Sequence, residues 1–222
     1  TLYPLARSMN RKLEFYVGPT NSGKTYNAMK KLKEANSGLY LAPLRLLALE
    51  GYEDLKESNI EASLITGEEQ QLSEDAAHIC STIEMLDFDL EVDVAVIDEV
   101  QMLEDIDRGW AWVNAIIGVP AKKVIMTGSV NALEAVKRIV QYLDEELEVV
   151  RHKRKNPLLV LEKWTPLEKL ENGTALIAFS RAEVLKLKQK LQKKYSVSVI
   201  YGNLSPEVRR DEARRFRDGQ SQ

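Results

Sequence analysis

One stretch of the sequence has the residue types and the spacing of a loop that binds phosphate groups. It runs from Gly18 to Thr25 and follows the pattern Gly-x-x-x-x-Gly-Lys-Thr. Gly18 and Gly23 allow backbone conformations in which successive N–H groups can surround an oxyanion. Lys24 can then reach the β- and γ-phosphates of a nucleotide, while the Thr25 hydroxyl binds Mg²⁺. We predict a nucleotide-binding loop made of Gly18, Pro19, Thr20, Asn21, Ser22, Gly23, Lys24 and Thr25.

A pair of carboxylates follows an apolar run further along the chain. Asp98 and Glu99 come directly after VDVAVI at residues 92–97. An acidic residue at the carboxyl end of a buried strand can complete the shell of a Mg²⁺ ion, and the next one can orient or deprotonate an attacking water. Taken alone, the pair could be a solvated strand end. Together with the loop it predicts a nucleoside triphosphate bound with Mg²⁺, with Thr25 and Asp98 as metal ligands.

A parallel sheet covered by helices would bring both groups of residues together, because loops that follow parallel strands emerge at the same edge of the sheet. Short apolar runs alternate with stretches of helical period, which is the pattern of this α/β class. The predicted strands are residues 13–17, 38–41, 62–65, 78–81, 92–97, 123–126 and 148–150. The predicted helices are residues 25–35, 44–57, 109–117 and 131–143.

A charged stretch divides the chain. RHKRKNP, at residues 151–157, ends in a proline and has no apolar periodicity, so we predict a linker after a first domain of residues 1–150. Beyond it the alternation restarts, with predicted strands at 158–164, 174–180 and 196–202 and predicted helices at 182–194 and 206–218. These elements make a thin layer for an α/β domain. We therefore expect residues 158–222 to be a second domain that is cut short.

Composition limits the classes of partner. With 31 basic and 34 acidic residues and a net charge of −3, the chain has no global positive field, so nucleic-acid binding must come from local patches. The one cysteine, Cys80, rules out an intramolecular disulfide framework and a thiolate zinc site. No apolar run approaches the roughly 18 residues of a membrane span. We expect a soluble, intracellular protein without a membrane partner.

Two families place G-P-x-x-S-G-K-T ahead of a strand that ends in D-E-x-Q. One is the zinc-ribbon type of thymidine kinase, a small-molecule phosphotransferase whose two motifs are similar to residues 18–25 and 98–101. That resemblance implies four zinc-binding cysteines, but this chain has one cysteine. It also assigns no function to residues 157–222. The kinase is kept as an alternative.

The chain resembles more closely the Suv-type DExH-box RNA helicases of mitochondria and bacteria, which belong to superfamily 2. The resemblance extends from residue 3 to residue 217 and keeps the family's order of segments. These segments are TLYPLARSMNRK, GPTNSGKTY, APLRLLALE, TGEE, STIEM, VAVIDEVQM, DRGWAWVNAIIG, IAFSRAEV and VIYGNLSPEVRRDEARRF. The combination is far more specific than any one motif.

This resemblance implies a P-loop NTPase fold of two RecA-like domains, with ATP and Mg²⁺ held between them and RNA running across the top. Gln101 takes the last place of the DExH/Q motif, where the family couples the nucleotide state to the nucleic acid. The motif usually written Ser-Ala-Thr appears as Thr-Gly-Ser at residues 127–129, which makes its coupling role less secure. The catalytic residues that carry over are Lys24, Asp98, Glu99 and Gln101.

The same resemblance assigns residues that contact nucleic acid. They are Pro43, Leu44, Arg45, Thr66, Gly67, Thr82, Ser180, Arg181 and Gly202. Backbone N–H groups and hydroxyls in such segments suit phosphates, which position a strand without reading its sequence. Simpler interpretations stay open: Arg45 could be a surface helix residue, and Thr66 and Thr82 could be caps. Trp110 and Trp112 are expected to pack in the protein rather than to stack on bases.

Arginines are frequent near the end of the sequence. Five of them between residues 209 and 217 are interspersed with acidic residues, which favours ion pairing along a solvated helix. The family's arginine fingers belong to a Q-x-x-G-R-x-G-R motif, which this sequence does not contain. Such an arginine is worth about 10³ to 10⁵ in rate, so we expect a fragment that binds ATP and turns it over slowly.

The resulting hypothesis is an ATP-dependent RNA helicase that couples hydrolysis to movement on RNA and to unwinding. Its expected partners are single-stranded RNA or an RNA duplex, with DNA left open, and an exoribonuclease by family resemblance. We expect a bacterial cytoplasmic protein, with the mitochondrial matrix as the second choice. The thymidine kinase and a nucleotide-gated RNA-binding module without unwinding activity are the alternative functions.

Overall fold

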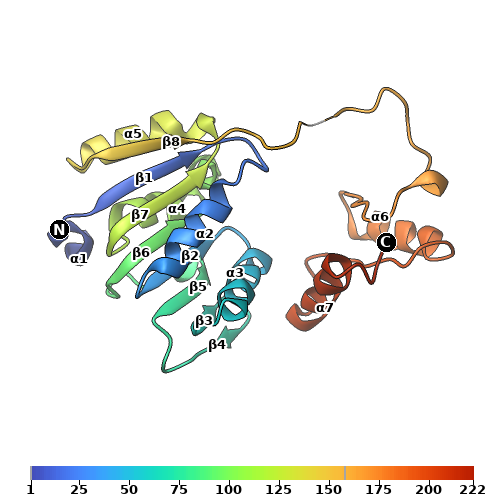
Figure 1. Cartoon of the computed structure of the whole chain (residues 1–222), viewed down its shortest axis with the longest axis horizontal. Coiled ribbons are helices and arrows are strands. Elements are labelled where there is room, and N and C mark those ends of the chain that lie inside the picture. Colours follow the sequence, from blue (N-terminus) through green and yellow to red (C-terminus); the bar gives the residue numbers. More distant parts are fainter. Residues whose placement is uncertain (1, 158) are drawn as a thin grey trace. The chain divides into compact units, whose positions relative to one another are not determined.

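A computed structural model of the protein describes residues 2–157 and 159–222 (Figure 1). The chain divides into two compact units, Thr1–Pro157 and Leu158–Gln222. The first unit contains the sheet and both groups of residues predicted for the nucleotide site. The second contains the remaining helices described below.

In the described part of the first unit, eight strands form one sheet in the order β4-β3-β5-β2-β6-β7-β1-β8. The pairings are parallel, except that β3 and β4 are antiparallel. The strands are β1 (Lys12–Val17), β2 (Gly38–Ala42), β3 (Ala62–Ile65), β4 (Gln70–Gln71), β5 (His78–Thr82), β6 (Val92–Ile97), β7 (Ala121–Gly128) and β8 (Leu147–Arg151). Because β2, β6, β7 and β1 are parallel neighbours, the loops after them lie side by side.

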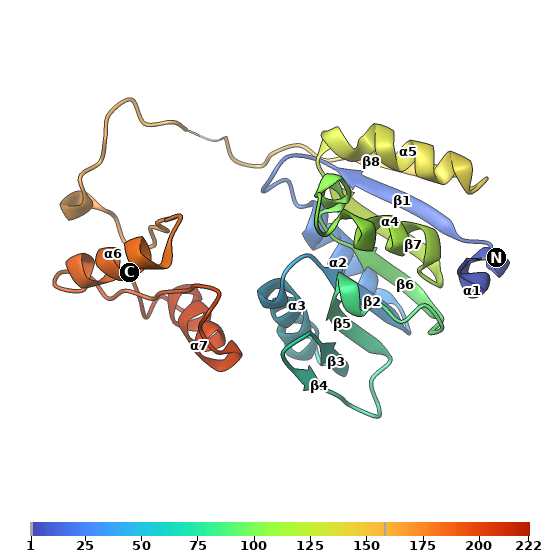
Figure 2. The same cartoon turned by 180° about the vertical axis from the view of Figure 1, so that it is seen from behind.

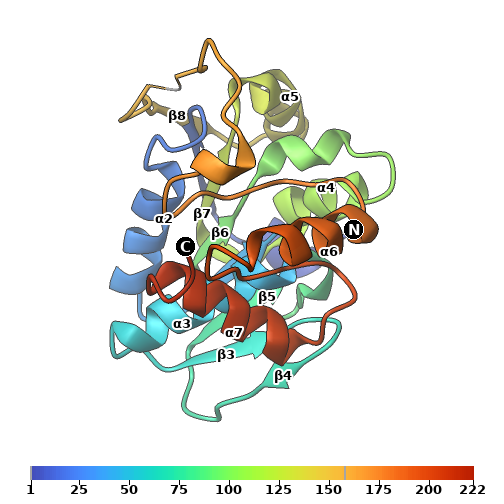
Figure 3. The same cartoon turned by 90° about the vertical axis from the view of Figure 1, so that its right-hand side faces the viewer.

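Helices cover both faces of this sheet. Two of them, α2 (Lys24–Glu34) and α3 (Arg45–Glu57), lie in front of it in Figure 1. The opposite face carries α4 (Gly109–Gly118) and α5 (Leu133–Tyr142), which are in front in Figure 2, and the layers separate in Figure 3. The short elements are α1 (Pro4–Ser8), η1 (Ile83–Met85), η2 (Val100–Glu104) and η3 (Val130–Ala132). No helix within residues 2–157 and 159–222 combines the length and the apolar character needed to cross a membrane.

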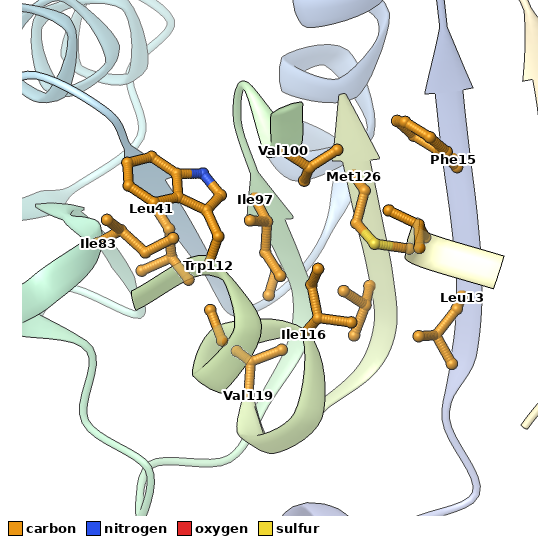
Figure 4. Packing of buried hydrophobic residues seen from close by; sticks show 14 of the residues in the cluster. Leu13, Phe15, Leu41, Ile83, Ile97, Val100, Trp112, Ile116, Val119 and Met126 are labelled. Atoms are coloured by element: carbon orange, nitrogen blue, oxygen red, sulfur yellow. The ribbon is translucent and has the colours of Figure 1, made fainter. Parts of the chain in front are cut away.

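The central strands are apolar on both faces because each face packs against helices. Successive residues of a strand point to opposite sides, so Leu41 joins the cluster under α4 while Tyr40 joins the cluster under α2 and α3. Figure 4 shows the α4 side, where the Trp112 ring lies next to Leu41 and Ile83. Trp112 is fully buried and packs in the core as expected, whereas Trp110 is 56% exposed. Burial on both faces explains why the strands read as continuous apolar runs.

The elements predicted within residues 13–150 are present in the structure. The seven predicted strands and the four predicted helices are confirmed, with ends that differ by at most two residues. The predictions missed α1 and β4, which have five and two residues. Elements this short contain too few residues to show a hydrophobic period.

The three strands predicted in the second unit are wrong. Within residues 159–222 the structure has helices α6 (Arg181–Leu191) and α7 (Pro206–Arg217) and the turn η4 (Leu167–Lys169), but no strand. Leu158, the first residue of one predicted strand, lies outside the described residues. Apolar side chains of these segments are open to solvent: Ile177 is 86% exposed and Phe179 is 97% exposed. A strand exists only through hydrogen bonds to a neighbouring strand, and the described residues of these segments make none.

The two predicted helices of the second unit are confirmed because helical hydrogen bonds are local. Ser180 precedes α6 and accepts a hydrogen bond from the backbone N–H of Glu183. Ser205 precedes α7 and accepts one from Val208, and Pro206 occupies the first helical position. Such caps and a proline at the first position define helix starts from sequence alone.

Two arginines tie the start of the chain to the first unit. Arg11 donates two hydrogen bonds to the carboxylate of Glu145, at 2.6 and 3.0 Å, and two more to backbone carbonyls near the end of α4. Arg7 donates to the same carboxylate at 2.9 Å. These basic residues therefore belong to the folded unit, because their charges are neutralised by a partner 134 or more residues away in the chain.

Glu145 should stabilise the fold in a pH-dependent way. Burial alone would raise the pKa of its carboxyl group, but the hydrogen bonds and charges of Arg11 and Arg7 lower that pKa below its usual 4.5. A lowered pKa means that the stabilisation is present well above pH 4.5 and is lost as the pH falls through the folded-state value. We expect Glu145→Gln to lower the free energy of unfolding by about 1–3 kcal/mol at neutral pH, and by less in acid. Urea unfolding at both pH values measures this, and an equal loss at both would contradict it.

Candidate nucleotide and nucleic-acid site

The predicted phosphate loop lies between the end of β1 and the start of α2. The Gly18 N–H donates to the carbonyl of Gly128 at 3.1 Å, which joins the loop to the end of β7. A Cβ on Gly18 would lie 2.7 Å from Ser22 Oγ and 2.8 Å from the backbone carbonyl oxygen of His152, so a larger residue would have to displace backbone. Gly23 has a φ of 82°, a left-handed conformation that favours glycine. Gly23 is therefore favoured by its own backbone conformation, and Gly18 by the close approach of Ser22 and His152.

The interior of this loop has polar groups that suit an anion. Lys24 begins α2, and its buried side chain folds back so that Nζ donates to the carbonyl of Pro19 at 3.1 Å. Ser22 Oγ is buried and has no hydrogen-bond partner among the described residues. Buried hydroxyls are normally satisfied, and a phosphate oxygen within the loop would satisfy this one. The residues present therefore fit a bound phosphate chain.

Asp98 is the acidic residue at the end of β6, and it contacts the phosphate loop. Its side chain is 3% exposed. The Thr25 hydroxyl donates to Asp98 Oδ1 at 3.1 Å, so the two predicted metal ligands lie next to one another. A hydroxyl and a carboxylate are hard oxygen ligands of the kind that Mg²⁺ prefers, and Mg²⁺ usually takes only one or two carboxylates. This donor set fits a magnesium ion.

Two further residues hold the carboxylate of Asp98, and sequence reasoning did not assign either as its partner. The Tyr40 hydroxyl donates to Asp98 Oδ2 at 2.7 Å from β2, and the Thr127 hydroxyl donates to Oδ1 from β7. Burial raises the pKa of Tyr40 well above its usual value, and the negative charge of Asp98 raises it further. Tyr40 therefore stays protonated and keeps donating. In the sequence, the tyrosine within the otherwise aliphatic run GLYLA was the one feature that could have indicated this role of Tyr40.

Glu99 follows Asp98 and turns the chain sharply. Its φ of 55° is left-handed, which is unfavourable for a residue with a side chain and is concentrated at functional sites. The side-chain amide of Gln101 donates to the Glu99 carboxylate, and its oxygen accepts from the backbone N–H of Ser129 at 3.3 Å. Gln101 thus connects the predicted catalytic base to the segment after β7.

Residues 127–129, where β7 ends, depart from the family's usual Ser-Ala-Thr, and the structure gives a steric reason. A Cβ on Gly128 would lie 2.8 Å from a methyl carbon of Val100 and 2.9 Å from Gln101 Oε1. An alanine here would push Gln101 away unless the backbone moved. Glycine therefore allows the close approach of Gln101 to this segment.

Thr127 should support the candidate site structurally. It is fully buried, and its hydroxyl accepts from the backbone N–H of Glu99 at 3.2 Å while donating to Asp98. Thr127→Val keeps the shape of the side chain but leaves that N–H without its partner. We expect the free energy of unfolding to fall by about 1–3 kcal/mol, measured by denaturant unfolding. Thr127→Ser keeps the hydroxyl and serves as the control, and a valine variant as stable as the wild type would contradict this role.

Three groups of predicted nucleic-acid residues lie at the carboxyl ends of β2, β3 and β5. Leu44 is exposed beside the buried Pro43, and the Arg45 guanidinium pairs with the carboxylate of Glu68. Gly67 has open space around its Cβ position, with the Arg45 guanidinium 3.9 Å away. Because the strands are parallel, these residues share the sheet edge that carries the phosphate loop.

The two predicted threonines of this edge are buried rather than exposed. Thr66 Oγ1 accepts hydrogen bonds from the backbone N–H groups of Glu68 and Glu69, at 3.3 and 3.1 Å, so it caps the turn after β3. Thr82 ends β5 and precedes η1 without a side-chain capping bond. The alternative interpretation as a turn cap therefore describes Thr66 and not Thr82.

The remaining predicted nucleic-acid residues lie in the second unit. Ser180 caps α6, and the guanidinium of Arg181 lies 5.4 Å from the centre of the Tyr201 ring. Gly202 has no atom within 4 Å of its Cβ position. Among the α7 arginines, Arg215 pairs with Glu212 at 3.0 Å, as expected of a solvated helix face.

The segment predicted as a linker runs beside the phosphate loop. The backbone N–H of His152 donates to the carbonyl of Val17 at 2.7 Å, and that of Lys155 donates to the carbonyl of Asn21 at 3.3 Å. The ammonium of Lys155 lies 3.3 Å from the Cβ position of Gly23. Sequence reasoning missed these contacts, because a charged stretch without periodicity gives no sign of what it lies against. No group of three or more His, Cys, Asp or Glu residues in the described chain could hold a metal ion.

Comparison with known proteins shows a clear family match. Residues 1–152 match the family described as the DEXQ-box helicase domain of Suv3. The ATP-dependent RNA helicase SUV3 homolog, mitochondrial, of Caenorhabditis elegans is 40% identical over 97% of this chain and 31% of its own length. The mitochondrial SUV3 helicase of Saccharomyces cerevisiae is 40% identical over 98% of this chain and 31% of its length, and the mitochondrial DExH18 helicase of Arabidopsis thaliana is 39% identical over 100% and 29%. The chain therefore spans about 30% of the length of these relatives.

Solved structures support the fold. S. cerevisiae Dbp5 L327V, bound to RNA and ADP BeF3, superposes with a TM-score of 0.61 at 16% identity, over 95% of this chain and 64% of that one. The same variant bound to Nup159, Gle1 H337R, IP6 and ADP gives 0.52 at 18% identity, over 99% and 68%. The predicted RecA-like α/β fold is confirmed.

The expectation of a bacterial cytoplasmic protein is wrong. The relatives named above all carry the description mitochondrial. A folded nucleotide-binding unit has the same physical requirements in either compartment, and Arg7 and Arg11 serve the fold here. The sequence pattern therefore gave no information with which to distinguish a bacterial cytoplasmic protein from a mitochondrial one.

Proposed function

The chain belongs to the family of the Suv3 DEXQ-box helicase domain, and from that premise we propose that it binds ATP with Mg²⁺ as part of an RNA helicase. Hydrolysis would drive movement on RNA and its unwinding in the whole protein. The observation that carries this proposal is the 3.1 Å hydrogen bond between Thr25 Oγ1 and Asp98 Oδ1. It brings the phosphate loop and the acidic strand end into one site.

Each residue of this site has a role that its position supports. Lys24 would exchange the Pro19 carbonyl for phosphate oxygens, since both are acceptors for its ammonium. Thr25 and Asp98 would hold Mg²⁺, with Tyr40 and Thr127 fixing the carboxylate. Bound ATP and Mg²⁺ supply the transferable phosphoryl group and the positive charge that neutralises its oxygens.

Glu99 would act as the base that orients and deprotonates the attacking water. Glu99 is partly buried, and its carboxylate is held by the amide of Gln101, which restricts its orientation. Gln101 also bonds the backbone after β7. A change in the position of Glu99 would therefore be transmitted through Gln101 to the backbone after β7.

We propose that RNA lies across the sheet edge formed by the loops after β2, β3 and β5. In the first unit the contacts would come from Pro43, Leu44, Arg45, Thr66, Gly67 and Thr82, and in the second from Ser180, Arg181 and Gly202. Such contacts read phosphates, so single-stranded RNA, an RNA duplex and DNA share this chemistry. We further propose a mitochondrial location, and an exoribonuclease as partner by family resemblance.

The experiment that tests the proposal is an ATPase measurement on the full-length protein. Phosphate release should rise when single-stranded RNA is added, and a labelled RNA duplex should be unwound only with ATP and Mg²⁺. Single-stranded DNA in the same assay measures nucleic-acid preference. Hydrolysis indifferent to any nucleic acid, or transfer of phosphate to thymidine, would contradict the proposal.

A further inference from the structure

Arg108 lies just before α4 and joins segments that are distant in the sequence. Its Nη2 donates to the backbone carbonyl of Pro43 at 2.7 Å, and its Nε donates to the carboxylate of Glu84 at 2.7 Å. Its own backbone N–H is held by the side chain of Asp105 at 2.8 Å. The guanidinium is planar and presents donors in a fixed fork, so two acceptors held by one fork are fixed relative to one another.

The two acceptors belong to the edge proposed to bind RNA. Pro43 follows β2 and begins the segment that contains Leu44 and Arg45. Glu84 lies in η1, two residues after Thr82 at the end of β5. Arg108 therefore fixes the spacing between two of the segments that would contact the RNA backbone.

Arg108 also connects this edge to the candidate nucleotide site. Its guanidinium carbon lies 5.2 Å from the centre of the Trp112 ring, and Trp112 Nε1 donates to the backbone carbonyl of Asp98 at 2.9 Å. The side chain of Asp98 is the proposed metal ligand, and the backbone of the same residue accepts the hydrogen bond of the buried indole. Because interiors are close-packed, a shift of Asp98 would displace the indole and then the guanidinium.

We propose that Arg108 is a positioning residue that couples occupancy of the nucleotide site to the affinity of the first unit for RNA. The inference rests on the proposed function, and it deepens that function by naming the side chain through which the two ligands influence one another. The path runs from Asp98 through Trp112 to Arg108, and from there to the carbonyl of Pro43 and the carboxylate of Glu84.

The test measures coupling rather than affinity alone. RNA binding to the full-length protein is measured with and without a saturating non-hydrolysable ATP analogue, and the ratio of the two dissociation constants gives the coupling factor. In Arg108→Gln the coupling factor should be closer to one than in the wild type, by about 5-fold or more. Arg108→Lys keeps the charge but loses the fork, and should give an intermediate factor. Arg138→Gln, at an exposed arginine of α5, is the matched control and should keep the wild-type factor.

A purely structural role for Arg108 predicts a different result. RNA affinity would then fall equally with and without the analogue, and an unchanged factor in Arg108→Gln would overturn the proposal. If that variant unfolds, Glu84→Ala removes one acceptor of the fork while leaving Arg108 in place, and its factor should move in the same direction; an unchanged factor there would overturn the proposal as well. Thermal unfolding identifies the folded variants. A wild-type protein whose ATPase ignores RNA contradicts the proposed function itself, whereas equal coupling in wild type and variants contradicts only the role of Arg108.

Discussion

Replacing Glu99 by glutamine should leave ATP binding intact and slow RNA-stimulated hydrolysis by about 10²- to 10⁴-fold, the usual contribution of a general base. The substitution removes the basic oxygen but keeps the size of the side chain. Its amide oxygen can still accept the hydrogen bond from Gln101, so the left-handed turn at this residue should persist. The measurements are the rate of phosphate release at saturating ATP and RNA, and the affinity for a fluorescent ATP analogue, both on the full-length protein.

The comparison of the two measurements decides the role of Glu99. Glu104→Gln, at an exposed carboxylate at the end of η2, is the matched control and should hydrolyse ATP like the wild type. If Glu99→Gln lost binding and turnover in equal proportion, Glu99 would be a ligand-holding residue rather than the base. If it kept full turnover, the base would have to be another group.

Replacing Lys24 by alanine should weaken ATP binding, which Glu99→Gln leaves intact, and should lower the affinity for Mg–ATP by about 10- to 100-fold. A hydrogen bond to a charged partner is worth about 1.5–3 kcal/mol, and each 1.4 kcal/mol is tenfold in affinity. Lys24 is suited to this role because its ammonium already lies inside the loop, held by the Pro19 carbonyl. Titration calorimetry with Mg–ATP measures the loss.

The matched control is Lys30→Ala, which removes an exposed ammonium from the same helix and should bind like the wild type. The shift of the thermal midpoint that Mg–ATP produces gives a second measurement, since a ligand stabilises the folded state by an amount that grows with the logarithm of its concentration divided by Kd. Unchanged affinity in Lys24→Ala would mean that the loop does not hold the phosphates, and the proposed site would then be wrong. Both predictions depend on the loop and the carboxylates acting in one site.

The strands of the first unit could be predicted because their signal is local. LEFYV and VDVAVI are buried on both faces, and continuous apolar runs bounded by turn residues read as parallel strands. The phosphate loop was predictable for the same reason, since its pattern Gly-x-x-x-x-Gly-Lys-Thr is made of consecutive residues and the left-handed φ of Gly23 belongs to the loop itself. The three strands predicted in the second unit had equally good local patterns and were wrong. A pattern indicates that a segment could be a strand, and the partner strand decides whether it is one.

The partners of Asp98 illustrate what local patterns could not give. Tyr40 and Thr127 reach its carboxylate because β2 and β7 lie on either side of β6. In sequence order β2, β6 and β7 are the second, sixth and seventh of the eight described strands, so the adjacency of β2 and β6 follows from the topology of the sheet. Local patterns also could not explain the departure from Ser-Ala-Thr at residues 127–129. A Cβ on residue 128 would lie too close to Gln101, and this becomes visible only once the two segments are packed together.

The sequence by itself determined the class of fold, the phosphate loop and the carboxylates of the acidic strand end, because glycine geometry, apolar period and charge are properties of a few consecutive residues. Only the tertiary structure decided which side chains surround Asp98, and that Arg108 joins the segment after β2 to η1. These contacts link residues far apart in the chain. Their formation depends on strand order and register, which arise from the packing of the whole unit and not from any one segment of it.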